Sequence, residues 1–438
     1  MQIRVCRTFC VFASIVMLSA VCSKAFAAEG DPFAGVSQVT PANLVEAVLA
    51  RNPTLPAMQA AWEASKARIE QASALDDPIL SYGLAPGAAQ SMGFERGQIV
   101  ELSQALPWPG KRRLRGNAAL YEADAAREDI VQTRLKLIAG AKSAFADWHY
   151  IHEAIRINRV NQGLLREFEA IAELKYSTGR ASKQDALRAE VERNLLEHQA
   201  IVLERKRREI LTHLNTLLNR PPDRPVPPPA ALGEPVRLPA AERLRLAAVA
   251  ARPELAALTA KIKAQQARVD GAELNFYPDF WVAAGYEGRW DEEEQRYSVG
   301  VGINIPLDQD KRRAAVDEAN AARLQAEWDQ QAKAVEVAGE VQLAYDRVEE
   351  SRHILALYRE KLLPKADENL QAAKADYESG AGDFLTLVTA EKNLLETQLT
   401  AIRVLADYHR RLALLESSIG GAEHLSAAGK PQEKTGHE

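Results

Sequence analysis

The chain of 438 residues contains only three cysteines, and all of them lie near its N-terminus. Cys6, Cys10 and Cys22 fall within a segment that has the features of a cleaved leader. The chain that remains after such cleavage has no cysteine. This absence excludes disulfide bonds, thiolate metal sites and cysteine nucleophiles from the mature protein.

Other features are also scarce beyond the N-terminal segment. Only Met58 and Met92 remain there, too few to form a run of thioether ligands for soft metal ions. This part of the chain has no stretch of about 18 consecutive apolar residues, the length that a membrane-spanning helix needs. The sequence has no Gly-rich phosphate loop, nucleophile elbow or cluster of metal ligands. We therefore expect no enzymatic activity, no cofactor and no resident metal.

The N-terminal segment has the three parts of a secretory signal peptide. Arg4 and Arg7 give a basic start, residues 9–21 are mostly apolar, and residues 25–27 form an Ala-x-Ala cleavage site. We predict a signal peptide at residues 1–27. Lipidation of Cys22 is an alternative, although Val21 is larger than the residue that such a site prefers. Cleavage removes three of the 55 basic residues and leaves 52 against 60 acidic ones, a net charge of −8, which gives no general attraction to nucleic acid.

The sequence repeats itself at an interval of about 200 residues, which is far longer than the roughly 20–50 residues of solenoid repeats. The interval therefore indicates two copies of one large unit. The paired segments are Arg51-Asn52-Pro53 with Arg252-Pro253, Leu106-Pro107-Trp108-Pro109-Gly110-Lys111-Arg112 with Ile305-Pro306-Leu307-Asp308-Gln309-Asp310-Lys311-Arg312, Tyr176-Ser177-Thr178-Gly179 with Tyr377-Glu378-Ser379-Gly380, and Asn194-Leu195-Leu196-Glu197 with Asn393-Leu394-Leu395-Glu396.

Each copy has the same predicted order of elements: a helix, a β-hairpin, and a very long helix that reverses into a second helix. Alternation of apolar and polar residues predicts the strands. A seven-residue spacing, as in Leu137, Ala141, Ala144 and Trp148, predicts helices packed along a shared seam. The predicted helices cover residues 41–75, 110–176, 183–218, 240–275, 311–378 and 384–418, and the hairpins flank a Gly-rich loop at 87–97 and join 279–288 to 297–305.

These elements predict a fold that is mainly α with a small β part. We divide the chain into a first repeat at residues 28–219, a linker at 220–239 with eight prolines, a second repeat at 240–420 and a flexible tail at 421–438. Four strands cannot close a useful barrel and would leave exposed edges. Since one strand face is apolar and the other is polar, we expect three chains to form a tube with twelve strands. The alternative is a water-soluble coiled-coil protein with incidental hairpins.

The duplicated plan and its turn motifs resemble the TolC-like outer-membrane efflux family over residues 40–420. The resemblance rests on the order of the elements, on the two Tyr-x-x-Gly helix breaks, and on the turn that leaves the second strand of each copy. The Pro-Trp form of that turn is similar to members that serve heavy-metal (copper/silver or cobalt/zinc/cadmium) exporters. The turn residues are Pro107, Trp108, Gly110, Lys111, Arg112, Pro306, Lys311 and Arg312.

The resemblance implies a homotrimer with a 12-stranded outer-membrane β-barrel and an α-helical periplasmic barrel, to which each chain gives four strands. It further implies a passive exit channel that contacts outer-membrane lipid. The implied protein partners are a periplasmic membrane-fusion adaptor and an inner-membrane transporter, for which the RND type is favoured. Heavy-metal cations are the expected cargo. Drug efflux and type I protein secretion are alternatives with the same architecture, and a periplasmic coiled-coil adaptor is an alternative of a different class.

The resemblance also implies that both helix reversals lie at a periplasmic tip, where the tube narrows. Glycine suits these reversals because it tolerates positive φ. Asp383 is a candidate for a cation-binding ring or a helix N-cap, and the two tyrosines for gate contacts or helix-end packing. The implied tip residues are Tyr176, Gly179, Asp185, Tyr377, Gly380 and Asp383.

Three further features have both a functional and a simpler structural interpretation. His149 and His152 share one helix face, but no third ligand lies nearby in the sequence, so we favour a packing role over a metal pair. Trp108 and Trp290 are candidate anchors at a lipid interface. The acidic residues 291–294 beside Trp290 could collect cations, although a solvated loop is the favoured interpretation.

Overall fold

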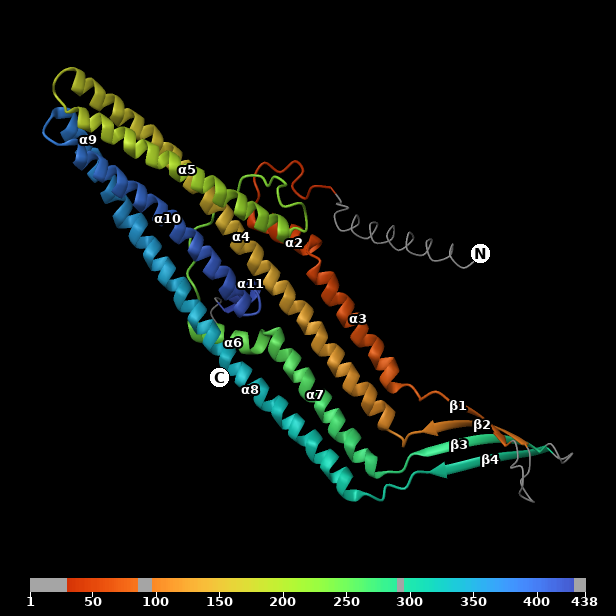
Figure 1. Cartoon of the computed structure of the whole chain (residues 1–438). Coiled ribbons are helices and arrows are strands. Elements are labelled where there is room, and N and C mark those ends of the chain that lie inside the picture. Colours follow the sequence, from red (N-terminus) through yellow and green to blue (C-terminus); the bar gives the residue numbers. More distant parts are fainter. Residues whose placement is uncertain (1–29, 86–96, 290–294, 429–438) are drawn as a thin grey trace, which may run out of the picture. The chain divides into compact units, whose positions relative to one another are not determined.

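The computed structural model describes residues 30–85, 97–289 and 295–428 (Figure 1). Several predictions therefore fall outside the described residues: the signal peptide, lipidation of Cys22, Trp290 with the acidic loop at 291–294, and the last ten residues of the tail. Within the described part of the chain, every helix is too short or too polar to cross a lipid bilayer.

The described elements follow the predicted order twice. The strands are β1 (Ile79–Ala85), β2 (Gly97–Leu106), β3 (Phe280–Arg289) and β4 (Gln295–Ile303). The helices are α2 (Pro41–Arg51), α3 (Thr54–Ser73), α4 (Lys111–Ser177), α5 (Lys183–Leu217), α6 (Ala241–Ala251), α7 (Pro253–Glu273), α8 (Gln309–Leu357), α9 (Leu363–Ser379), α10 (Phe384–Ser418) and α11 (Ala422–Ala428), with a 3-10 turn η1 (Leu274–Phe276) and a π-helical turn η2 (Tyr358–Leu362).

The first helix of each copy is two helices, where the sequence predicted one. Asn52 separates α2 from α3 and has extended backbone angles of φ −69° and ψ 123°. Arg252 separates α6 from α7 with nearly the same angles, φ −66° and ψ 123°. Each of these residues precedes a proline, whose ring disfavours the helical conformation of the residue before it. The same chemistry therefore breaks both copies at the same place.

The second long helix also departs from the prediction of an uninterrupted helix. The π-helical turn η2 lies between α8 and α9, directly before Pro364 in the first turn of α9. Proline has no N–H to donate to the carbonyl four residues earlier, and its ring crowds that carbonyl. A wider π-turn accommodates this without ending the helix. The tail differs as well, since its first part forms α11.

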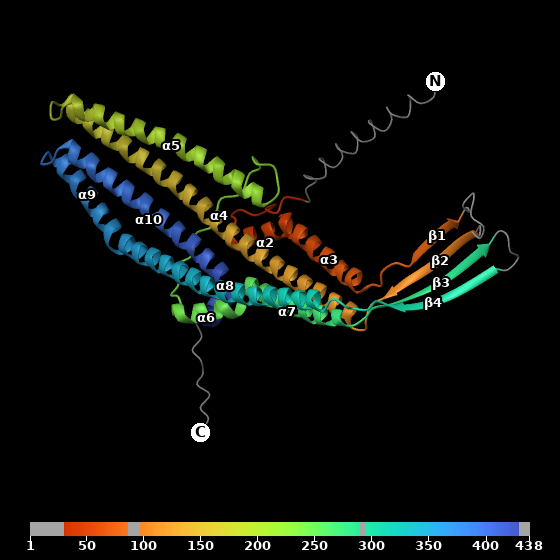
Figure 2. The ribbon, with the colours of Figure 1, turned by 60° about the horizontal axis from the view of Figure 1, so that its bottom comes forward.

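The four strands form one antiparallel sheet in the order β1-β2-β3-β4, with β1 and β4 at its edges (Figure 2). Its register joins the two copies, because β2 pairs with β3 along its whole length. Residues that face each other across an antiparallel pair share one side of the sheet. Two rows of one side are therefore Leu80, Leu102, Ala284 and Val299, and Tyr82, Val100, Tyr286 and Tyr297. A row of the other side is Ser81, Glu101, Gly285 and Ser298.

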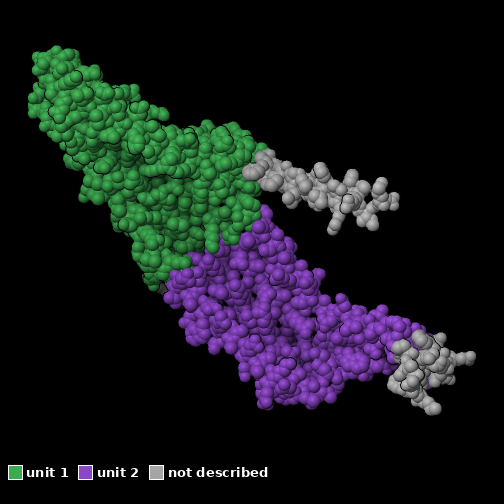
Figure 3. Space-filling model, in the orientation of Figure 1, with its two compact units in different colours: residues 1–55, 133–250, 337–438 green, residues 56–132, 251–336 purple. Residues whose placement is uncertain are grey.

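The chain divides into two compact units that cut across the two sequence copies (Figure 3). Unit 1 consists of Met1–Leu55, Thr133–Ala250 and Val337–Glu438, and unit 2 of Pro56–Gln132 and Ala251–Glu336. Each unit thus takes one part of each copy. The seam predicted on α4 is confirmed within unit 1, since Ala141, Ala144, Trp148 and Ile151 are all buried in one hydrophobic cluster.

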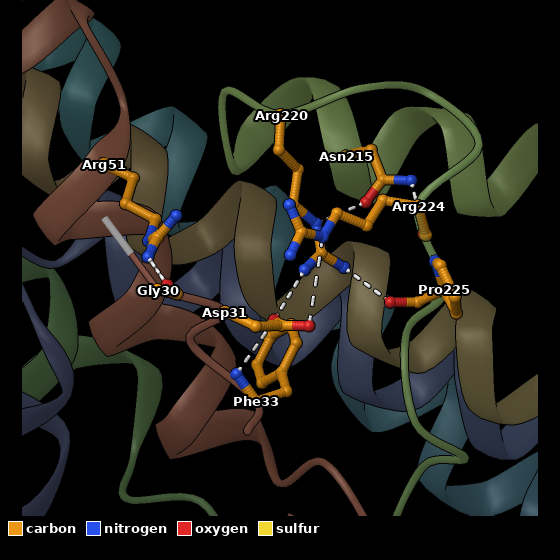
Figure 4. A network of polar contacts seen from close by, with 8 residues as sticks. All are labelled: Gly30, Asp31, Phe33, Arg51, Asn215, Arg220, Arg224 and Pro225. Atoms are coloured by element: carbon orange, nitrogen blue, oxygen red, sulfur yellow. Dashed lines mark hydrogen bonds and ion pairs between the residues drawn. The ribbon is translucent and has the colours of Figure 1, made fainter. Parts of the chain in front are cut away.

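The buried side chain of Arg220 connects the start of the linker to the N-terminal segment of unit 1 (Figure 4). The Arg220 guanidinium donates to Asp31 Oδ1 at 3.1 Å, to Asn215 Oδ1 at 2.6 Å and to the Pro225 carbonyl at 3.0 Å. It also lies 5.2 Å from the centre of the Phe33 ring. These contacts compensate much of the cost of burying the charge, although burial still lowers the pKa of Arg220.

Candidate functional site: the helix reversals and the strand-to-helix turns

The two helix reversals lie at the same end of unit 1, which we call the tip (Figure 1). Four helices share one hydrophobic cluster there. Residues of this cluster come from α4 (Leu165, Phe168, Ala172), α5 (Ala189, Leu196), α9 (Leu370, Ala373, Tyr377) and α10 (Phe384, Leu387, Val388, Leu394). The hairpin α4/α5 of the first copy therefore packs directly on the hairpin α9/α10 of the second.

Both reversals depend on a glycine in the left-handed region. Gly179 has φ +71° and Gly380 has φ +85°. In the first turn the Arg180 N–H donates to the Lys175 carbonyl at 2.7 Å, and in the second the Ala381 N–H donates to the Asp376 carbonyl at 2.9 Å. These bonds close the last helical turn in the manner of a glycine C-cap. These angles agree with the expectation that each reversal needs a residue that tolerates positive φ, while the location of both glycines at a periplasmic tip stays a prediction.

The second reversal is the tighter of the two. A Cβ added to Gly382 would lie 2.9 Å from the Asp376 Cβ, closer than such atoms approach. Asp383 follows directly as the N-cap of α10, and its carboxylate accepts the Thr386 N–H at 2.7 Å. This hydrogen bond lowers the pKa of the exposed Asp383 carboxyl. The structure thus gives Asp383 the cap role, while a role in a cation ring stays a prediction.

Asp185 does not occupy the position equivalent to Asp383. Asp185 lies in the first turn of α5, where its Oδ1 accepts the Ser182 hydroxyl at 3.0 Å. Ser182 is the N-cap of α5, so Ser182 is the counterpart of Asp383. The prediction of an acid after each turn pointed to Asp185 and missed Ser182. The signal was present, since Ser182 and Asp383 each follow the turn glycine by three positions.

The two tip tyrosines have different surroundings. Tyr377 is 4% exposed, and its ring packs edge-on against Phe384 with 5.2 Å between ring centres. Its hydroxyl is buried and has no hydrogen-bond partner among the described residues, and burial together with nearby Asp185 raises its pKa. Tyr176 is 49% exposed. Tyr377 therefore fits the helix-end packing role, because its hydroxyl forms no hydrogen bond to another helix among the described residues.

Three lysines connect the two hairpins across the tip. Lys374 on α9 pairs with Glu167 on α4 at 2.7 Å, and Lys392 on α10 pairs with Glu192 on α5 at 2.6 Å. Lys175 on α4 donates to the Tyr377 carbonyl and lies 4.4 Å from the centre of its ring. Separation of the two hairpins would break all three contacts. No local sequence pattern predicts these pairs, because their members are about 200 residues apart.

The first strand-to-helix turn, in unit 2, is organised around Asp279. Its Oδ1 accepts the Trp108 N–H at 2.7 Å and the Lys111 ammonium at 2.8 Å. Lys111 is only 5% exposed. The Trp108 ring stacks on Tyr277 and Phe280, with 5.0 and 5.7 Å between ring centres. Since Phe280 pairs with Leu106 and Ile303, this aromatic stack continues the apolar side of the sheet.

Two arginines make equivalent contacts in the two copies. Arg112 donates through Nε to the Ser73 carbonyl at 2.8 Å, and Arg312 donates through Nε to the Asn275 carbonyl at the same distance. Both acceptors lie where the preceding helix ends, and such carbonyls lack a partner within their own helix. Gly110 has φ +100°, which suits the turn that directs Arg112 to its acceptor.

The second strand-to-helix turn lacks the buried centre of the first. Lys311 is exposed, and its backbone N–H is capped by Asp308 Oδ1 at 3.0 Å. Leu307, which takes the place of Trp108 after the strand proline Pro306, is 82% exposed. The two turns therefore share the arginine contact and differ in the aromatic stack and the ion pair.

His149 and His152 are placed by packing. His149 is buried, and the ring of His152 meets Trp148 edge-on with 4.3 Å between centres. Burial lowers the pKa of both histidines. Across residues 30–85, 97–289 and 295–428, no group of three or more His, Cys, Asp or Glu side chains could hold a metal ion.

Comparison with known proteins finds relatives along most of the chain. The chain is 24% identical to "Nodulation protein T" of Rhizobium leguminosarum bv. trifolii, with 84% of this chain and 82% of the relative covered. It is 22% identical to "Pyoverdine export outer membrane protein OpmQ" of Pseudomonas aeruginosa, with 92% and 83% covered. It is 21% identical to "Cobalt-zinc-cadmium resistance protein CzcC" of Cupriavidus metallidurans, with 74% and 77% covered.

The fold is that of solved outer-membrane channels. The structure of CusC superposes with a TM-score of 0.76 at 17% identity and covers 91% of this chain and 96% of its own. The outer membrane efflux protein family matches this chain twice, at residues 44–220 and at residues 244–421, in keeping with the internal duplication. The chain therefore belongs to the outer membrane efflux protein family.

Proposed function

We propose that this outer-membrane efflux channel works as a homotrimer and is the passive exit duct of a tripartite system. In this proposal the tip of unit 1 docks to a periplasmic membrane-fusion adaptor, which connects the duct to an inner-membrane transporter of the RND type. The channel binds no cofactor, catalyses no reaction and contacts outer-membrane lipid through its sheet. Heavy-metal cations are its cargo.

The main support for the proposal is the sheet, which in a single chain is open and has two edge strands, β1 and β4. Tyr297, Val299 and Val301 on the edge strand β4 are 75%, 88% and 80% exposed. Apolar rows of this kind suit contact with lipid on one side, whereas the serine, glycine and glutamate rows suit water on the other. The edges β1 and β4 carry backbone groups that pair in a sheet closed by further copies. Three copies would contribute twelve strands.

The tip supports a duct that opens by movement between hairpins. Two hairpins pack on each other through one hydrophobic cluster and three lysine contacts. We expect such an interface to have two discrete arrangements, packed or separated, which is the property that a gate requires. The separated arrangement would present the tip to an adaptor.

The cargo is proposed from the relatives and from one acid. One relative is named for cobalt, zinc and cadmium resistance. The exposed Asp383 of each chain would place three carboxylates at the tip of a trimer, where they would attract cations. Another relative is named for pyoverdine export, which favours a small organic cargo as the second candidate. Type I protein secretion uses the same architecture, and a coiled-coil adaptor would be a protein of another class.

A deletion strain tests the function and the cargo together. Its susceptibility to copper, silver, zinc, cobalt and cadmium should rise while its susceptibility to common antibiotics stays unchanged. Increased sensitivity to antibiotics alone would replace metal by drug cargo, and loss of a secreted protein at unchanged tolerance would indicate protein secretion. Normal resistance to every compound, together with normal secretion, would refute the efflux function. A heat-modifiable trimer in outer-membrane fractions separates the channel from an adaptor.

A further inference from the structure

The tip contains a carboxylic acid that none of the roles above requires. Glu391 lies on α10 about two turns from the second reversal and is 1% exposed. Its helix neighbours at three and four positions, Leu387, Val388, Leu394 and Leu395, all belong to the hydrophobic cluster shared by the four tip helices. The side chain of Glu391 is therefore on the core face of α10, at the packing surface between the two hairpins.

The surroundings of Glu391 disfavour its ionised form. Its Oε1 atom is buried and has no hydrogen-bond partner among the described residues. The charge of Glu192 on α5 opposes ionisation of Glu391, and the charge of Lys392 favours it. Lys392, however, already pairs with Glu192 at 2.6 Å. Burial, reinforced by the charge of Glu192, raises the pKa of Glu391 to about 7.

We propose that Glu391 is a proton-controlled latch of the tip: the neutral acid allows the two hairpins to pack, and its ionisation favours their separation. The inference rests on the proposed function, because it assigns a regulation to the gate. A buried carboxylate without a partner is unfavourable in an apolar core. Separation of α10 from α5 would bring water to the carboxylate, so the ionised acid prefers the separated arrangement.

The second hairpin has the features that such a movement needs. The π-helical turn η2 and Pro364 interrupt regular helical hydrogen bonding at the start of α9, and such places often act as hinges. At its other end the hairpin reverses through Gly380 and Gly382. The segment between them is α9, which packs beside α10, the helix that carries Glu391 and Lys392. α9 can therefore move without unfolding α8.

The sign of the pH effect follows from the raised pKa. In the packed arrangement Glu391 loses its proton near pH 7, whereas in a hydrated, separated arrangement it would do so near the ordinary value of 4.5. Packing is therefore most favoured below pH 4.5 and is weakened as the pH rises toward 7. Between pH 6 and pH 8 the ratio of separated to packed hairpins should rise about tenfold for one chain.

Spin labels on both sides of the α5–α10 contact test this directly. Loss of residues 1–27 would leave the channel without natural cysteines, so Gln184→Cys and Thr389→Cys can be labelled in the purified full-length channel. Both positions are exposed. Pulsed EPR at pH 6 and pH 8 should show the ratio of the long-distance to the short-distance population rising about tenfold. Glu391→Gln, which keeps the shape of the neutral acid, should abolish this rise, and the exposed Glu396→Gln on the same helix should preserve it.

No rise in the parent protein, or an equal rise in Glu391→Gln, would overturn the latch. The labels report hairpin separation whether or not the protein conducts. Conductance of the same preparation in planar bilayers therefore tests the duct separately. A conducting channel whose tip ignores pH would refute the latch alone, and a pH-dependent tip in a protein that never conducts would refute the duct alone.

Discussion

The two copies of the repeat differ both at their helix reversals and at their strand-to-helix turns. At the helix reversals the second copy is the tightly built one, with Tyr377 buried, Gly382 in close contact with Asp376, and Asp383 capping α10. At the strand-to-helix turns the first copy is the tightly built one, with Lys111 buried against Asp279. The less buried counterparts are Tyr176 and Lys311.

This pattern separates what the architecture requires from what each copy has specialised to do. The reversal glycines and the Arg112 and Arg312 contacts occur in both copies, so they belong to the common scaffold. The buried tyrosine and the buried lysine occur in one copy each. Since a duplicated unit starts with identical sites, the differences mark where the two halves have unequal roles. For the tip, this favours the second hairpin as the half that moves.

The largest expected difference between the copies is at the tip tyrosines. Tyr377→Ala removes a buried aromatic ring from the four-helix cluster and should lower the free energy of unfolding by about 3 kcal/mol. Tyr176→Ala removes an exposed ring and should lower it by less than about 1 kcal/mol. Urea unfolding of the purified protein in detergent, followed by circular dichroism, measures both.

Tyr377→Phe sharpens the same comparison. The Tyr377 hydroxyl is buried without a partner, and removal of such a group is close to neutral or stabilising. An unchanged or higher unfolding free energy is therefore expected. A loss of more than about 1 kcal/mol would mean that the hydroxyl forms a hydrogen bond across the helices in the assembled channel, as a gate contact would. Equal losses for Tyr377→Ala and Tyr176→Ala would contradict the asymmetry of the tip.

The sequence predicted the reversals well because their causes are local. Glycine spacing and the end of the heptad pattern are enough to place both turns, and the structure puts them between α4 and α5 and between α9 and α10. The unequal burial of Tyr176 and Tyr377 could not be predicted, since it depends on which helices pack together across about 200 residues. The equivalence of Ser182 and Asp383 follows from their equal spacing after the turn glycine, whereas the prediction of an acid after each turn points to Asp185.

The next largest difference is expected at the two strand-to-helix lysines. Lys111→Met should lower the free energy of unfolding by about 2 kcal/mol, because it leaves Asp279 without its cation. This is below the loss for a fully buried pair, since the Asp279 side chain is 36% exposed. Lys311→Met is the matched control and should change it by no more than about 0.5 kcal/mol. Equal effects would show that burial of Lys111 does not matter.

The region around this turn shows where prediction from the sequence stops. The alternating strands and the long helix after them were predicted correctly, because their periodicity is strong. The breaks at Asn52 and Arg252 and the π-turn before Pro364 were missed, although each has a local cause in the proline that follows. The pairing of Lys111 with Asp279 has no local cause, because it depends on β2 lying beside β3.

The smallest expected effect on stability, and the most specific for cargo, concerns the two acids at the reversals. Asp383→Asn keeps a residue that can cap α10 but removes the charge, so it should weaken the block of single-channel current by multivalent cations while the helix start is preserved. Asp185→Asn is the matched variant, and it should leave the block unchanged because Asp185 lies within a helix turn beside Tyr377.

Because the cap hydrogen bond lowers the pKa of Asp383 below 3.8, its charge persists as the pH falls from 7 to 5, and the block should persist with it. If the block survives Asp383→Asn, Asp383 acts only as a helix cap. If Asp185→Asn weakens the block as much as Asp383→Asn does, both reversals contact the permeating cation.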